Sequence, residues 1–299
     1  MCNFNLTDNK GVIDFDTKVN EDVFLFNSLN AILKAKRNYV VKMPEKGSTV
    51  VACMSGGLDS IANISILINE YNYTVYPFFI NRGQTALSKE REAVHFFDNL
   101  FSEKYPNNYK KCLEISVDTP AKEYKDLLRD TKKKMSDVAR MRNISYPVRN
   151  PIIFLTGAEY AYSLKSKGED IKTIFAAHVA SDFSYHCSQT WTRNMNVLMC
   201  QIFDDWEMQF ISIPIETEFG NFFDKEVYVH YLDKYGLPIE KTRSCMKKFD
   251  KQCGDCPGCY DRRLGIQRAG VADKTEYLYE MSKDYPTYYA HEAEEKEMK

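Results

Sequence analysis

The stretch STVVACMSGGLDSI, residues 48–61, decides the fold of this chain. Its first half is a short apolar run, typical of a buried strand, and apolar residues recur at helical spacing between positions 61 and 68. Gly56 and Gly57 allow a tight turn between the two. A helix that starts there aims its free N–H groups and positive dipole end at the turn, which suits a phosphate. The stretch is neither a Walker loop nor a dinucleotide fingerprint, and a turn that binds nothing stays the alternative.

Strands and helices alternate along the rest of the chain. Further strands are predicted over residues 73–81, 111–118, 173–178 and 210–215, and helices over 22–36, 87–104 and 152–167. This alternation predicts an α/β fold with a doubly wound, mainly parallel five-stranded sheet. Ligands of such sheets bind at the carboxyl ends of the strands. We therefore expect the glycine loop, residues 81–84 and residues 178–182 to converge.

The nine cysteines fall into two groups. Five are scattered, and four lie within fifteen residues near the end of the chain: Cys245, Cys253, Cys256 and Cys259. Their spacing, with seven, two and two residues between them, lets four thiolates surround a tetrahedral Zn²⁺ ion. Because all four positions would be filled by protein, such a zinc is structural. An iron–sulfur cluster is the alternative.

Composition limits the kind of partner. The formal net charge of −2 gives no general attraction to nucleic acid, which makes a nucleic-acid partner unlikely on this ground. The chain has no run of about 18 apolar residues that could span a membrane. Its first residues lack the basic head and apolar run of a secretory signal, so a cytoplasmic location is expected.

Residues 55–60, SGGLDS, match the pattern SGGxDS. In this position the motif resembles the pyrophosphate loop of the N-type ATP pyrophosphatase (PP-loop) superfamily, whose members cleave ATP between the α and β phosphates and adenylate a substrate oxygen. The resemblance implies an adenine nucleotide alpha hydrolase-like (HUP-type) fold. It also implies Mg²⁺ at Asp59, since a carboxylate binds phosphate only through a cation. The ATP-binding residues it implies are Cys53, Met54, Ser55, Gly56, Gly57, Leu58, Asp59, Ser60 and Gln84.

Further segments are similar to the 7-cyano-7-deazaguanine synthase (QueC-like) family. They are YPVRN at 146–150, SCM at 244–246, CGDCPGCYDRR at 253–263 and GVADKTEY at 270–277. Gly83 and Gln84 stand where the family has a YGQ turn, and Lys225 stands at a family lysine. The resemblance runs from about residue 49 to 280.

The family converts 7-carboxy-7-deazaguanine to its amide and then its nitrile, with ATP and ammonia. The resemblance implies catalytic roles for Asp59, Arg149 and Lys225, and a structural Zn²⁺ at the four clustered cysteines. The substrate-binding residues it implies are Arg149, Asn150, Asp182 and Tyr185.

The chain departs from the family pattern on the substrate side. After Asp182 the family has a Gly-Tyr-Pro-Asp-Cys-Arg-like run, whereas this chain has FSYHCS at 183–188. Arg243 and Ser244 replace the tryptophan usual before the first cysteine. We therefore favour a QueC-like protein of a bacterial antiviral defence operon of the CBASS type, which forms an amide on a protein partner. Alternatives are a divergent synthase that uses ammonia, a tRNA-modifying PP-loop enzyme and a non-catalytic ATP-binding scaffold.

The sequence divides into four parts. Residues 1–47 form an extension, 48–240 the PP-loop domain, 241–280 the zinc-binding segment and 281–299 an acidic tail. The expected partners are a small 7-deazaguanine substrate, a protein acceptor from the same operon and a second copy in a homodimer.

Overall fold

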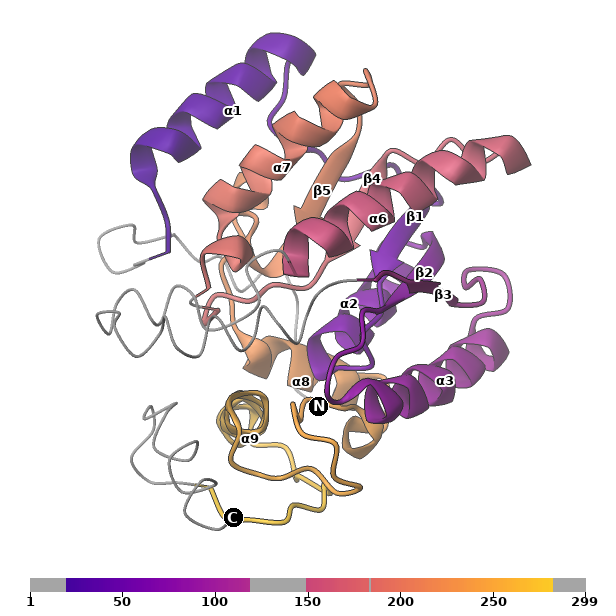
Figure 1. The fold of residues 1–299 in the computed structure, drawn as a ribbon, viewed down its shortest axis with the longest axis vertical. Coiled ribbons are helices and arrows are strands. Elements are labelled where there is room, and N and C mark those ends of the chain that lie inside the picture. Colours follow the sequence, from indigo (N-terminus) through magenta and orange to yellow (C-terminus); the bar gives the residue numbers. More distant parts are fainter. Residues whose placement is uncertain (1–19, 119–148, 183, 282–299) are drawn as a thin grey trace.

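The computed structural model describes residues 20–118, 149–182 and 184–281. Cys2, residues 146–148 of the YPVRN segment and the tail from 282 onward lie outside these ranges. Within them, five parallel strands form one sheet in the order β3-β2-β1-β4-β5 (Figure 1). The strands are β1 (Thr49–Cys53), β2 (Thr74–Asn81), β3 (Leu113–Ser116), β4 (Thr173–Ala176) and β5 (Gln209–Ser212). The strand order reverses between β1 and β4, so the binding crevice of such a sheet lies at their carboxyl ends.

Helices cover both faces of the sheet, which confirms the doubly wound α/β prediction. Along β1, Val50 and Ala52 pack with α2, α3 and α8, whereas Val51 packs with α6 and α7 on the opposite face. This alternation follows from the period of two in a strand. The helices are α1 (Val23–Arg37), α2 (Leu58–Asn69), α3 (Leu87–Lys104), α6 (Arg149–Ser163), α7 (Gln189–Ile202), α8 (Lys225–Lys234) and α9 (Pro257–Ala269).

Helix α1 lies against α7, outside the layer that covers the sheet (Figure 1). Asp22 caps the helix by accepting a hydrogen bond of 2.9 Å from the Leu25 amide. Its buried residues Phe26, Leu29 and Leu33 fall on one side at helical spacing. The predicted helix over 22–36 is thus confirmed, and it is a packed part of the fold.

Several predicted elements end or begin elsewhere. The strand expected over 111–118 spans only Leu113–Ser116, and the one expected over 173–178 ends at Ala176. The helix expected over 152–167 begins at Arg149 and becomes a 3₁₀ turn at Leu164. Pro151 falls in its first turn, where a missing N–H leaves no helical hydrogen bond unmade. The strand expected over 210–215 ends at Ser212, and Pro214, which has no N–H to donate to a sheet, lies in a 3₁₀ turn. Helices α7, α8 and α9 were not predicted from the sequence.

None of the helices in the described part of the chain is long and apolar enough to cross a membrane.

The packing of α1 can be tested by truncating one buried side chain. Leu33 is fully buried, whereas its neighbour Ile32 is 42% exposed. Leu33→Ala should lower the free energy of unfolding by about 2–5 kcal/mol, because it leaves a cavity between α1 and α7. Urea unfolding of both variants measures this, with Ile32→Ala as the matched control. Equal losses in the two variants would contradict the docking of α1.

Candidate active site and metal centre

The glycine loop joins β1 to α2 at the reversal of strand order. Gly56 has φ +75°, and a Cβ there would lie 2.9 Å from the Cβ of Ala93 on α3, so only glycine fits. Gly57 caps α2 and no side chain caps the helix, which leaves the N–H groups of the first turn open to an anion. The Oγ atoms of Ser55 and Ser60 lie 3.1 Å apart and hold the loop in shape. The shape of the loop therefore fits the predicted phosphate site.

Asp59 in the first turn of α2 forms an ion pair with Lys225, the first residue of α8. Its Oδ2 lies 2.8 Å from the Lys225 Nζ, and both side chains are largely buried. Burial opposes the charge of Lys225, but Asp59, Asp182 and Asp261 outweigh it and raise the pKa of the ammonium group. Lys225 is thus a permanent cation at the mouth of the glycine loop.

The second carboxylate oxygen of Asp59 bears on metal binding. Oδ1 is buried and has no hydrogen-bond partner among the described residues. A buried oxygen of this kind is costly unless it is satisfied. Mg²⁺ is bound through one or two carboxylates together with phosphate oxygens. The geometry of Asp59 therefore fits a magnesium ion that arrives with the nucleotide.

Gln84 shapes the turn after β2. Its side-chain amide donates hydrogen bonds to Glu90 at 2.6 Å and to the Ile80 carbonyl at 3.2 Å, and its oxygen accepts one from the Arg82 amide at 3.0 Å. These bonds engage both ends of the side chain within its own turn. The ATP contact of Gln84 stays a prediction, and the side chain is already hydrogen-bonded within the protein.

Asn150 ties the start of α6 to the segment after β4. It is buried, and its Nδ2 donates a 2.8 Å hydrogen bond to the His186 carbonyl and lies 3.1 Å from the His178 Nε2. Arg149 lies beside it, with Nη2 3.5 Å from the His186 Nε2. Both predicted substrate residues thus lie at the carboxyl edge of the sheet. Asn150 holds the start of α6 to the segment that follows β4.

Two histidines beside Arg149 are neutral at neutral pH. Burial, followed by the charges of neighbouring groups such as Arg149, lowers the pKa of His178 to about 4 and that of His186 to about 3. Neutral rings leave Arg149 as the cation on this side of the site.

Asp182 and Tyr185 stand in the segment between β4 and α7. The Oδ2 of Asp182 accepts a 3.1 Å hydrogen bond from the Val179 amide, which points the carboxylate back toward β4. The negative charge of Asp182 acts to raise the pKa of both Lys225 and His178, so its side chain lies near both. Tyr185 is 38% exposed in a 3₁₀ turn over Tyr185–Cys187 and lies at the surface.

The structure adds two acids that the sequence analysis missed. Asp224 caps α8 through a 2.8 Å hydrogen bond from the Lys225 amide, and an acid just before a periodic run is a sequence signal for such a cap. Asp261 follows the last cysteine by two residues, where the cysteine spacing predicts a metal site and gives no sign of a role for this acid. The charge of Asp224 raises the pKa of Asp59, and that of Asp261 raises the pKa of Lys225.

The four clustered cysteines meet in one buried metal-binding arrangement. The Sγ atoms of Cys245, Cys253, Cys256 and Cys259 all lie within 4.8 Å of one another. Two of the sulfur pairs are 3.8 and 4.0 Å apart. A tetrahedral ion with bonds of about 2.3 Å holds its sulfurs about 3.8 Å apart, so the four thiolates fit one ion.

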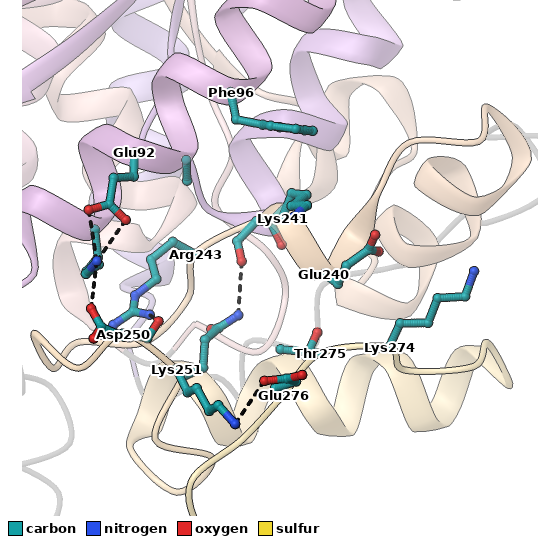
Figure 2. A pocket seen from close by; sticks show the side chains of 14 residues that line it. Glu92, Phe96, Glu240, Lys241, Arg243, Asp250, Lys251, Lys274, Thr275 and Glu276 are labelled. Atoms are coloured by element: carbon teal, nitrogen blue, oxygen red, sulfur yellow. Dashed lines mark hydrogen bonds and ion pairs between the residues drawn. The ribbon is translucent and has the colours of Figure 1, made fainter.

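The cysteine segment touches the glycine loop through its backbone. The Arg243 amide donates a 2.7 Å hydrogen bond to the Gly56 carbonyl. A pocket of about 520 Å³ lies beside this contact, between α3 and the cysteine segment (Figure 2). Ion pairs close its walls, from Lys89 to Asp250 at 2.9 Å and from Lys251 to Glu276 at 3.0 Å. The pocket thus lies at the interface between α3 and the cysteine segment.

A parallel sheet of this order, with SGGxDS at the carboxyl end of β1, is the arrangement that the resemblance to the PP-loop superfamily implies. The family model described as queuosine biosynthesis protein QueC matches residues 49–270. The chain belongs to this family and is an enzyme.

Curated relatives are matched over nearly their whole length. The 7-cyano-7-deazaguanine synthase of Thermoplasma volcanium is 27% identical over 256 residues, covering 83% of this chain and 95% of the relative. That of Campylobacter hominis is 24% identical, covering 76% and 99%. Among solved structures, the U34-tRNA thiolase NcsA from Methanococcus maripaludis with its [4Fe-4S] cluster is 15% identical and covers 82% of this chain and 72% of its own. Its TM-score of 0.34 is too low to support an argument about this chain.

The buried histidines predict a loss of stability in acid. The unfolded pKa of histidine is about 6.5, above the folded values, so the unfolded chain binds more protons as the pH falls below about 6.5. Stability should therefore fall from pH 7 to pH 5, and His186→Gln should reduce the fall. Urea midpoints at the two pH values measure it. The exposed His95→Gln should behave as wild type, and an unchanged fall in His186→Gln would contradict the prediction.

The cysteine site predicts one bound metal ion per chain. Cys256→Ser should lower the metal content severalfold, because a hydroxyl replaces one of four thiolates. Elemental analysis of the purified protein measures the metal. Cys112→Ser, which lies outside the cluster, should keep the full content. Full retention in Cys256→Ser would show that the four sulfurs do not share an ion.

Proposed function

We propose that this chain is an ATP-dependent 7-cyano-7-deazaguanine synthase that uses ammonia. The observation that carries the proposal is the Asp59–Lys225 pair at the mouth of the glycine loop, within the family assignment. A phosphate cradle next to an acid with an unsatisfied buried oxygen suits cleavage of ATP at the α phosphate with magnesium. The resemblance to the family implies that the substrate is 7-carboxy-7-deazaguanine.

The reaction begins with adenylation. A carboxylate oxygen of the substrate attacks the α phosphorus of ATP, and pyrophosphate leaves. The N–H groups at the start of α2 and the Lys225 ammonium bind phosphate oxygens, where negative charge gathers as the bond breaks. Asp59 is the residue that would hold Mg²⁺, which supplies further charge compensation on the leaving pyrophosphate.

Ammonia then attacks the acyl carbon. A C–N bond forms, the bond from carbon to the phosphate oxygen breaks, AMP leaves and a proton is released to give the amide. In a second round the amide oxygen is adenylated, and loss of AMP with the remaining amide protons leaves the nitrile. Arg149 at the start of α6 is the cation placed to bind the carboxylate, since the neighbouring histidines are neutral. Asn150, Asp182 and Tyr185 are proposed to surround the base.

The comparisons shift the balance between the two acceptors considered from the sequence. The curated relatives are matched across 80% and more of this chain in two cases, and each is named as the synthase. They offer no support for amide formation on a protein in antiviral defence, which the sequence departures had favoured. We therefore propose ammonia as the acceptor.

We propose Zn²⁺ at the four cysteines. The sulfur spacing fits one ion, whereas a cluster of several iron atoms holds its thiolates farther apart. With four protein ligands the ion has no open position, so its role is to hold the segment from Cys245 to Cys259 beside the glycine loop.

The activity can be tested with purified protein, ATP, ammonium and 7-carboxy-7-deazaguanine. Wild type should release pyrophosphate and AMP and form the nitrile, which mass spectrometry detects. Asp59→Asn should lower turnover by about 100-fold or more, because it removes the charge that holds magnesium. The exposed Asp233→Asn serves as control and should keep wild-type turnover.

The outcomes separate the hypotheses. Intact nucleotide with wild type would contradict the adenylation step. AMP release together with an adduct on a protein, and no nitrile, would return the acceptor to a protein amine. Full turnover in Asp59→Asn would remove Asp59 from the catalytic residues.

A further inference from the structure

The residues just before α1 contact the segment that follows Asp182. The side-chain amide of Asn20 donates hydrogen bonds to the carbonyls of Asp182 at 2.9 Å and Ser184 at 3.2 Å. The Glu21 carboxylate accepts hydrogen bonds from the amides of Gln189 at 2.7 Å and Thr190 at 2.8 Å. Two neighbouring residues thus hold both ends of the segment over residues 182–190.

We propose that Asn20 and Glu21 are positioning residues for the substrate site, which hold the segment after Asp182 in its binding shape. The inference rests on the proposed function for the identity of the substrate. It goes beyond that function because it assigns a role to residues that precede the family match, which begins at residue 49.

The segment that Asn20 and Glu21 contact differs in sequence from the family pattern. Residues 183–188 depart from the family run that follows the aspartate, and they lack its proline, second acid and arginine. Asn20 is 1% exposed, so its hydrogen bonds to two carbonyls form away from water, where they are hard to replace. The backbone on both sides of position 183 is therefore held from outside the segment.

Glu21 acts at the start of α7. Its carboxylate bonds two of the N–H groups that an α-helix leaves open at its N-terminus, and it also accepts a 2.5 Å hydrogen bond from the Thr190 Oγ1. A negative charge is favourable at this end of a helix dipole. Glu21 thereby acts together with Ser188, the N-cap residue of α7, in holding the start of the helix next to the Tyr185–Cys187 turn.

A buried arginine on α7 joins α7 to α1. Arg193 on α7 is fully buried and lies with its Nη1 2.7 Å from the Glu216 Oε2. Its Nε donates a 2.9 Å hydrogen bond to the Oδ1 of Asn30 on α1. Moving α1 away would leave the buried Nε–H of Arg193 without its acceptor, which opposes such a displacement. Asn20 and Glu21 therefore approach the segment from a rigid base.

The held segment carries groups of the proposed substrate side. Asp182 contributes its carboxylate, and the His186 carbonyl accepts the hydrogen bond of Asn150 beside Arg149. A shift of this segment would move these groups while leaving the glycine loop and the Asp59–Lys225 pair in place. We therefore expect such a shift to weaken the binding of the deazaguanine base and to leave the binding of ATP nearly unchanged.

The test measures steady-state kinetics of Asn20→Ala and Glu21→Gln in the full chain. Each should raise the KM for 7-carboxy-7-deazaguanine by about tenfold, since hydrogen bonds of this kind are lost from a buried position. The KM for ATP should change less than about twofold, since the glycine loop keeps its contacts. The exposed Glu45→Gln is the matched control and should resemble wild type in both constants.

Hydrogen exchange gives a second measurement that does not depend on the substrate. The amides of Gln189 and Thr190 should exchange about tenfold faster in Glu21→Gln than in wild type, because their charged acceptor is lost. Glu45→Gln should leave them unchanged.

The results distinguish this inference from the proposed function. Unchanged exchange in Glu21→Gln overturns the inference, as does a lower melting temperature with no selective rise in the KM for the base. If wild type consumes no ATP with the carboxylate, the proposed function fails, and the exchange rates of Gln189 and Thr190 still decide whether Glu21 holds the segment.

Discussion

The ion pair between Asp59 and Lys225 is the interaction on which the rest of the site depends. It joins the first turns of α2 and α8 at the edge of the sheet. Breaking a buried pair by removing one partner typically costs several kcal/mol, since the other charge is left alone. α8 packs in turn against α9, where Gly265 lets the helices approach, because a Cβ there would lie 2.8 Å from the Lys225 Cβ. One pair thus fixes the nucleotide loop relative to the cysteine segment.

The charges around this pair are strongly asymmetric. The charges of Asp59, Asp182 and Asp261 raise the pKa of Lys225. Burial, together with the charges of Asp182, Asp224 and Asp59, raises the pKa of Asp261 to about 7. Across the site, Arg149 stands among neutral histidines. An excess of acids is unfavourable to a bare nucleotide but favourable to one that brings a divalent cation. This charge balance fits the magnesium–nucleotide complex of the proposed function better than free ATP.

The sequence predicts the sheet well and some helices poorly, for physical reasons. β1 and β4 are apolar runs with clear borders, and the loop over residues 55–60 is a motif with a mechanism. α7 was missed although Trp191, Met195 and Met199 recur every four residues, because buried polar residues such as Arg193 and Asn196 interrupt its apolar side. α9 was missed for the same reason, since Arg262 and Gly265 lie on its buried side. The contact of Glu21 with Gln189 joins residues 168 positions apart, which local patterns do not encode.

The hydrogen bond from the Arg243 amide to the Gly56 carbonyl makes the glycine loop depend on the cysteine segment. It lies two residues from Cys245, so the thiolates that bind metal also anchor the loop that binds phosphate. Oxidants attack thiolates in preference to most other side chains. Oxidation of one sulfur would release the ion, free the segment and disorder the phosphate cradle. Nucleotide binding would then be lost under oxidative stress through a centre that takes no part in the chemistry.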